Sequence, residues 1–147
     1  MIKSLESITK ALQAWQREAD KQIIAVAKTE QPAIEGLNID EQMFKQGKRA
    51  DGAAITPPYT AFTKRIKQQK GQPTNRVTLR DTGAFHKSVS VQWRNTEFLM
   101  VASDPKTPDL VRKYSPEILG LSDDSLARLN VLLTTKIQNA FRKHVLQ

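Results

Sequence analysis

Residues Ser88–Ala102 read SVSVQWRNTEFLMVA, and this stretch decides the fold class of the chain. From Ser88 to Trp93 apolar residues alternate with polar ones, which is the period-2 pattern of a half-buried strand. Glu97–Ala102 is apolar after its first residue, as in a more buried strand. Arg94–Thr96 is short enough to join the two strands as a β-hairpin. We therefore expect a small antiparallel sheet at this point of the chain.

Helical patterns occupy both ends of the chain. Residues 1–30 carry apolar side chains at steps of three and four, and we expect Pro32 and Gly36 to end this helix. Residues 122–146 form a second long helix, which Ser122 caps and in which the two following aspartates favour the helix dipole. The two expected apolar faces consist of Ile2, Leu5, Ile8, Leu12, Trp15, Ala19, Ile23 and Val26, and of Leu126, Leu129, Leu133, Ile137, Ala140, Phe141 and Val145.

The sequence therefore predicts an α+β fold, in which long N- and C-terminal helices pack on a small antiparallel sheet with a β-hairpin. Between residues 41 and 80 we expect a short helix, Glu41–Gln46, which Asp40 begins and Gly47 stops. Another helix should follow Pro58, and Val77–Leu79 alternates like a short, half-exposed strand. Residues 81–102 form a turn and the hairpin, and a short helix is expected near residues 109–114.

Composition limits the classes of protein to which the chain can belong. Its 147 residues suffice for one domain with one core, so we expect residues 1–147 to form a single domain. The chain has no cysteine, which excludes disulfides and thiolate metal sites. Neither a signal peptide nor a run of about 18 apolar residues is present, so no membrane association is expected. We expect a soluble protein that is made in the cytoplasm.

The net charge of +8 is concentrated in one segment of the chain. Residues 41–80 contain nine lysines and arginines against two acidic residues, a local net charge of +7. Such a basic segment can neutralise phosphates, or it can face an acidic patch on a protein neighbour. A solvated loop without a partner is the third interpretation, and the charges alone do not decide among the three.

No catalytic or metal-binding pattern is apparent in the sequence. The two histidines, His86 and His144, lie far apart, and both are expected to be structural surface residues. Arg80, His86 and Tyr114 faintly resemble the catalytic set of tyrosine recombinases, but the segment between them does not fit that motif. We expect no enzymatic activity, no metal and no cofactor.

Three phrases of sequence, in a fixed order, carry a resemblance to a known family. The first reads Pro58, Tyr59, Thr63 and Lys67; the second reads Leu79, Asp81, Thr82, Gly83, Phe85 and Ser88; the third is Leu119-Gly120-Leu121-Ser122. In this order they resemble the virion-morphogenesis proteins of tailed bacteriophages, which include tail-completion, minor tail and head–tail connector proteins. The resemblance covers about residues 59–133.

The resemblance implies a structural component of a tailed-phage virion. It would act at the head–tail junction (neck) or the tail end, as a ring of identical subunits bound to portal, connector or tail proteins. In this interpretation the functional residues are interface residues, and DNA lies within reach. Asp81, Thr82 and Gly83 are expected to be structural. The six expected contacts are Lys64, Arg65, Lys67, Lys70, Arg76 and Arg80.

Two other classes of function stay open at this point. A small basic nucleic-acid-binding protein would use the same cations, although Tyr59 and Phe62 are the only aromatic residues interleaved with them and their spacing suits a packed helix face. A small phage enzyme or nuclease would need a constellation of carboxylates and histidines, which the sequence does not offer.

Overall fold

The computed structural model describes residues 4–147, so Ile2, the first residue of the expected N-terminal apolar pattern, lies outside the described residues. The chain divides into two compact units. We call residues up to Pro32 together with 128–147 the helical unit, and residues 33–127 the central unit. The expectation of a single domain stays a prediction, because two compact units can still fold as one.

Two long helices form the helical unit. Helix α1 (Leu5–Thr29) begins at Ser4, whose hydroxyl accepts a hydrogen bond of 3.1 Å from the amide of Ser7. Helix α6 (Asp123–Leu146) contributes its residues from Arg128 onward. The ring of Trp15 meets that of Phe141 edge to face at 5.4 Å, while Glu30 pairs with Lys136 at 3.6 Å. The two helices therefore run antiparallel.

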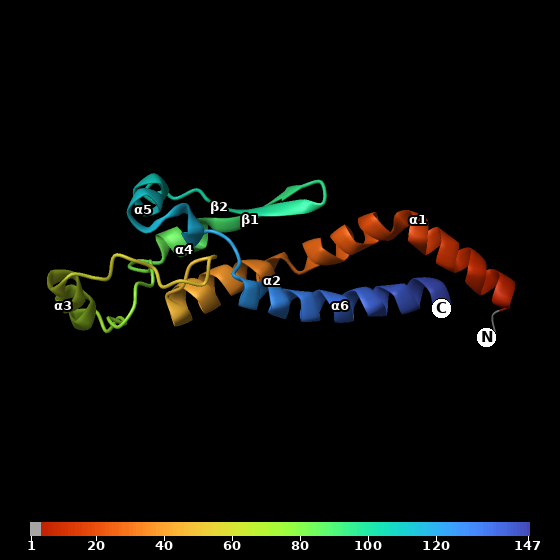
Figure 1. Ribbon diagram of the computed structural model, residues 1–147, viewed down its shortest axis with the longest axis horizontal. Coiled ribbons are helices and arrows are strands. Elements are labelled where there is room, and N and C mark those ends of the chain that lie inside the picture. The colour runs from red at the N-terminus through yellow and green to blue at the C-terminus, as the bar shows by residue number, and fades with distance from the viewer. Residues whose placement is uncertain (1–3) are drawn as a thin grey trace. The chain divides into compact units, whose positions relative to one another are not determined.

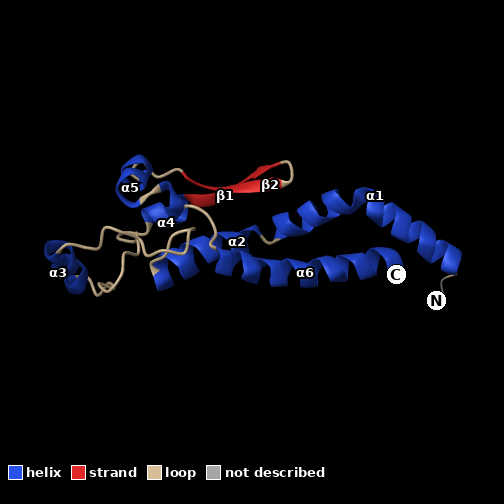
Figure 2. Ribbon diagram, viewed as in Figure 1, coloured by secondary structure: helices blue, strands red, loops and turns tan. Residues whose placement is uncertain are grey.

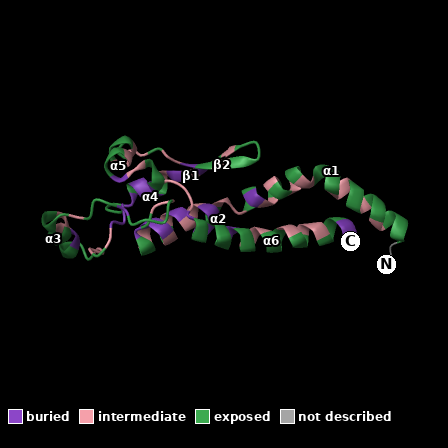
Figure 3. Ribbon diagram, in the orientation of Figure 1, coloured by how far each residue is buried: buried purple, intermediate pink, exposed green. Residues whose placement is uncertain are grey.

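The expected apolar face of α1 is only partly covered in the single chain. Ile8, Trp15 and Val26 are half-buried, whereas Leu5 and Leu12 are exposed (Figure 3). On α6, Leu129 and Val145 are buried. The helical periodicity of both segments is confirmed, but part of the apolar surface of α1 stays in contact with solvent.

The helix-ending role expected of Pro32 and Gly36 is wrong. Helix α1 ends at Thr29, and α2 (Gln31–Gly36) continues directly into the π-helix η1 (Leu37–Gln46). Pro32 lies in the first turn of α2, where a missing N–H costs no hydrogen bond. Gly36 keeps a helical φ of −60°. Asp40 consequently lies inside a helix rather than at its start.

Gly47 does end this helix, as its position after Gln46 predicts. Its φ is +62°, a left-handed conformation that favours glycine. A side chain here would also collide with its surroundings, because a Cβ atom would come within 2.8 Å of the Cβ of Arg76. The glycine therefore ends the helix and allows the chain around Arg76 to approach closely.

The predicted hairpin is confirmed and belongs to the central unit (Figure 2). Strand β1 (Val89–Arg94) pairs antiparallel with β2 (Glu97–Ala102), in a register that places Val91 opposite Met100 and Arg94 opposite Glu97. Asn95, with a φ of +50°, makes the turn. The α+β class is therefore confirmed.

In the central unit, α4 and α5 lie near the end of the hairpin that is away from its turn (Figure 1). Helix α4 (Ala84–Ser88) packs against both strands, and α5 (Thr107–Tyr114) precedes the 3₁₀ turn η2 (Pro116–Ile118). Helix α3 (Ala61–Gln69) starts at Thr60, whose hydroxyl accepts from the amide of Thr63. The buried apolar residues of this unit are Ile34, Met43, Ile55, Val77, Leu79, Phe85, Val89, Val91, Met100, Tyr114 and Ile118.

No helix within residues 4–147 has the length and apolar character needed to cross a membrane.

Candidate functional site

The connection Val77–Leu79 is not the strand that its alternation predicts. Its three residues are all buried, and the backbone of Thr78 is bound by side chains instead of a neighbouring strand. The amide of Thr78 donates to the hydroxyl of Tyr59 at 2.9 Å, and its carbonyl lies 2.8 Å from Nε2 of His86. These two bonds replace the ladder of a sheet, because buried backbone groups need partners.

His86 is buried, so its expected place on the surface is wrong. Nε2 donates to the carbonyl of Thr78 and the ring packs 6.3 Å from that of Phe85, measured between centroids. Burial lowers the pKa of His86 below its usual value; the hydrogen bond to Thr78 raises the pKa in part, and the charge of Arg80 lowers it. The neutral ring is therefore the form that fits the fold.

Asp81, Thr82 and Gly83 build a corner between α3 and α4. Thr82 Oγ1 accepts from the amide of Ala84 at 3.2 Å, and Gly83 has a φ of +89°. Asp81 Oδ1 accepts from Lys70 Nζ at 2.6 Å, and this bond lowers the pKa of the Asp81 carboxyl. The three residues therefore fix the path of the backbone between α3 and α4.

Lys67 is the buried cation of the basic segment. Its side chain donates to the carbonyl of Arg80 at 3.0 Å and to Oε1 of Gln72 at 3.1 Å, and its Nζ lies 4.9 Å from the centre of the Tyr59 ring. Only 7% of the residue is exposed. Lys67 therefore ties α3 to the corner and does not belong to the exposed surface of the segment.

The six predicted contact residues separate into two groups. Lys67, Lys70 and Arg76 bind within the chain; Arg76 donates through Nε to the carbonyl of Phe44 at 2.7 Å. Lys64 and Arg65 are exposed, and within residues 4–147 the side chain of neither has a hydrogen-bond or ion-pair partner. The third exposed residue, Arg80, has its guanidinium 5.0 Å from the centre of the Phe44 ring.

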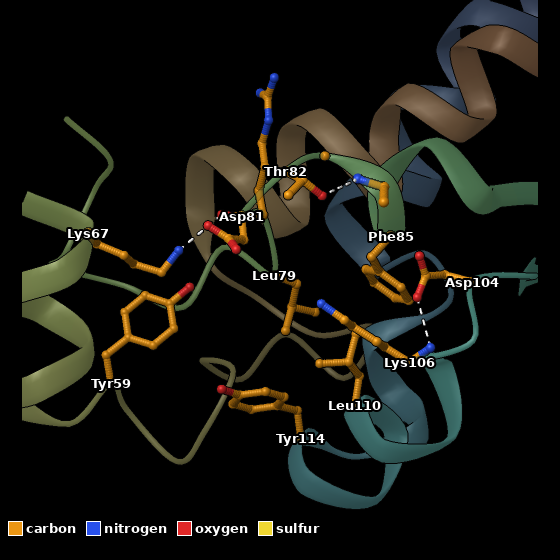
Figure 4. A pocket seen from close by; sticks show the side chains of 13 residues that line it. Tyr59, Lys67, Leu79, Asp81, Thr82, Phe85, Asp104, Lys106, Leu110 and Tyr114 are labelled. Atoms are coloured by element: carbon orange, nitrogen blue, oxygen red, sulfur yellow. Dashed lines mark hydrogen bonds between the residues drawn. The ribbon is translucent and has the colours of Figure 1, made fainter. Parts of the chain in front are cut away.

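A cavity of about 230 Å³ lies beside the corner, and we call it the basic cavity (Figure 4). Leu79, Phe85 and Leu110 are apolar residues of its lining, and Leu79 has a left-handed φ of +55°. Asp104 at the rim already accepts from the amide of Lys106 at 2.8 Å. The full lining is Tyr59, Lys67, Leu79, Arg80, Asp81, Thr82, Gly83, Ala84, Phe85, Asp104, Lys106, Leu110 and Tyr114.

The basic cavity combines apolar side chains with an excess of one positive charge, because three cations line it (Lys67, Arg80 and Lys106) against the two carboxylates of Asp81 and Asp104. Lys67, Asp81 and Asp104 are engaged in hydrogen bonds within the chain. Of the residues that faintly resemble a recombinase set, Arg80 and Tyr114 line the cavity but His86 does not. Within the described part of the chain no group of three or more histidines and carboxylates is placed to hold a metal ion.

Two buried side-chain amides, Asn38 and Gln42, hold the segment Leu119–Ser122, which is the third phrase of the resemblance. Sequence reasoning did not identify them. Gln42 on η1 donates to the carbonyl of Gly120 at 2.9 Å and accepts from the amide of Ser122 at 2.8 Å. One turn earlier, Asn38 donates to the carbonyl of Ile118 at 3.2 Å. Both amides are fully buried. Their i, i+4 spacing was the only signal available in the sequence.

Ser122 caps α6 as predicted, because its hydroxyl accepts from the amide of Ser125 at 3.2 Å. The phrase Leu119–Ser122 is therefore held by η1 on one side and opens α6 on the other.

No known protein family, curated protein or solved structure matches this chain. The resemblance to phage virion-morphogenesis proteins consequently rests on the three phrases of sequence and on what their residues do.

Proposed function

We propose that this chain is a structural component of a tailed-phage virion, which acts at the head–tail junction or the tail end as a ring of subunits. The observation that carries the proposal is the corner Asp81–Gly83. Its residues belong to the second phrase of the resemblance, and they brace the backbone and the neighbouring helices. A motif whose residues shape and hold the backbone in this way supports a building block rather than an enzyme.

The basic segment supplies the surface for a neighbour. Lys67, Lys70 and Arg76 hold it in one conformation, which lowers the entropic cost of binding. Lys64 and Arg65 stay available, and Arg80 is exposed although its guanidinium lies over the Phe44 ring. Free cations on a pre-organised support suit an acidic surface on a portal, connector or tail protein, because complementary charge steers the encounter and sets the register.

The alternative is a small nucleic-acid-binding protein that uses the same free cations. Phe62 is the exposed aromatic residue of α3, whereas Tyr59 is half-buried and its hydroxyl is occupied by Thr78. One exposed ring gives a poor platform for stacked bases. The virion interpretation is therefore preferred.

Deletion of the gene from its phage, followed by complementation in the host, tests the proposal. A virion role predicts normal accumulation of phage DNA but no complete particles, as judged by electron microscopy, and rescue by the wild-type chain. The double variant K64E/R65E should fold and fail to rescue, whereas a variant at an exposed residue of α6, Gln138→Glu, should rescue. Reduced phage DNA in the deletion strain, together with salt-dependent DNA binding by the purified chain, would favour the alternative.

A further inference from the structure

We propose that the chain self-associates head to tail, with Phe62 of one copy entering an apolar groove beside β2 of the next copy. The inference rests on the proposed ring of subunits and names the two surfaces that build it. Both surfaces belong to the central unit. The two are different patches, so the contact is heterologous, and repetition of such a contact closes a ring when the rotation per subunit allows it.

The projecting surface is Phe62 on α3. Tyr59, just before α3, and Ile66 on α3 are half-buried, whereas 69% of Phe62 is exposed. Arg65 is also exposed and lies three residues further along the helix, so it is a neighbour of Phe62 on the helix surface. An exposed aromatic side chain beside an unpaired cation is typical of the anchor of a protein interface.

The receiving surface is a groove of about 470 Å³, which we call the β2 groove. Leu99 and Leu126 line it while 41% and 45% of their surfaces stay exposed. Its volume lies within the range of about 300–1,000 Å³ that binding pockets occupy. The lining residues are Thr96, Glu97, Phe98, Leu99, Met100, Leu119, Gly120, Leu121 and Leu126.

Charge selects the β2 groove over the basic cavity as the place for Phe62. Glu97 is the one charged residue among those that line the groove. Asp123 is exposed and lies three residues before Leu126 on α6, so the two are neighbours on the helix surface. The carboxylates of Glu97 and Asp123 attract Arg65, whereas the lining of the basic cavity carries a net positive charge that disfavours it.

A single copy does not fill its own groove. Helix α3 and the turn between β1 and β2 lie at opposite ends of the central unit (Figure 1). The occupant that we assign to the groove is a second copy of this chain, whose Phe62 and Arg65 match the apolar lining and the carboxylates of the groove.

Mixing two deficient variants tests this geometry. Phe62→Asp removes the projecting aromatic ring and leaves the β2 groove intact. Leu126→Lys places a charge in the β2 groove and leaves Phe62 intact. Sedimentation velocity over a concentration series should show oligomers larger than dimers for the wild type. Each variant alone should be monomeric, with the dissociation constant raised roughly 30-fold or more. An equimolar mixture of the two should form dimers and nothing larger, because only one intact contact can form between them.

Three controls keep the test decisive. Circular dichroism establishes that the variants fold, and Leu99→Lys is the second groove variant should Leu126→Lys fail to fold. Val131→Asp alters another exposed apolar residue, on α6, and should associate like the wild type. High salt should weaken association of the wild type.

A wild type that stays monomeric, a Phe62→Asp variant that associates like the wild type, or a mixture without dimers would each overturn the inference. The virion proposal would survive any of these results if complete particles contain the chain. Conversely, Phe62-dependent rings of a chain that is missing from particles would contradict the virion proposal alone.

Discussion

Replacement of Gln42 by methionine tests the structural argument where it is most quantitative. Gln42 is fully buried on η1 and makes two hydrogen bonds to the segment that leads into α6, one to Gly120 and one from Ser122. Methionine keeps a similar length and fills the same space, so packing changes little. What the substitution removes is the pair of bonds.

The expected loss follows from the two backbone groups that are left without partners. A buried donor or acceptor that loses its partner costs about 1–3 kcal/mol, so the free energy of unfolding should fall by about 2–6 kcal/mol. For a chain of this length each kcal/mol lowers the melting temperature by roughly 2–4 °C. We therefore expect the melting temperature of Gln42→Met to be lower by at least about 4 °C.

Urea and thermal unfolding followed by circular dichroism measure this loss. Gln46→Met is the matched control, because Gln46 lies one turn later on the same helix and is exposed. It should change the free energy of unfolding by no more than about 0.5 kcal/mol. If Gln42→Met were as stable as Gln46→Met, the two amide bonds would not hold the Leu119–Ser122 segment, and the reasoning would be refuted.

Two further predictions concern Gly47 and His86. Gly47→Ala should lower the free energy of unfolding by at least about 1 kcal/mol more than Gly52→Ala. Both substitutions strain a residue with a left-handed φ, but only the Cβ atom at position 47 also collides, at 2.8 Å from Arg76. Equal losses in urea unfolding would contradict the close approach of Arg76 to Gly47. Burial lowers the pKa of His86 in the folded chain, so the unfolded chain binds a proton at a higher pH than the folded chain does. The free energy of unfolding of the wild type should therefore fall as the pH drops from about 7 to 5. His86→Gln should flatten this fall and His144→Gln should retain it, in urea titrations at each pH; an unchanged slope in His86→Gln would refute the assignment.

The elements that the sequence predicted well are those with strong periodicity. The hairpin follows from alternation in Ser88–Trp93, a short joining segment and an apolar second strand, and the structure confirms both strands to within one residue. The two long helices follow from apolar steps of three and four, and Ser122 caps α6 as expected. In each case local pattern and tertiary packing favour the same structure.

The elements that the sequence predicted poorly depend on side chains distant along the chain. Alternation around Thr78 indicates a strand, but Tyr59 and His86 bind its backbone in place of a second strand. Gly36 keeps a helical conformation, although glycine more often ends helices. The hydrogen bonds of Gln42 join residues about 80 positions apart, and no local sequence pattern predicts them.

The candidate site was predictable in part. Charge counting located the basic segment and spacing identified the corner, but neither separates a free lysine from a bracing one. Lys64 and Lys67 lie three residues apart on α3, yet one is exposed and the other is buried against Tyr59 and the carbonyl of Arg80. Which cations face outward depends on how α3 lies against the corner, and this arrangement is set by tertiary contacts.

Cryo-electron microscopy of complete phage particles tests the central claim most directly. The account predicts that the chain is present as a symmetric ring at the neck or the tail end, with Lys64 and Arg65 against an acidic surface of a neighbouring protein. Complete, infectious particles whose density and protein content lack the chain would contradict it.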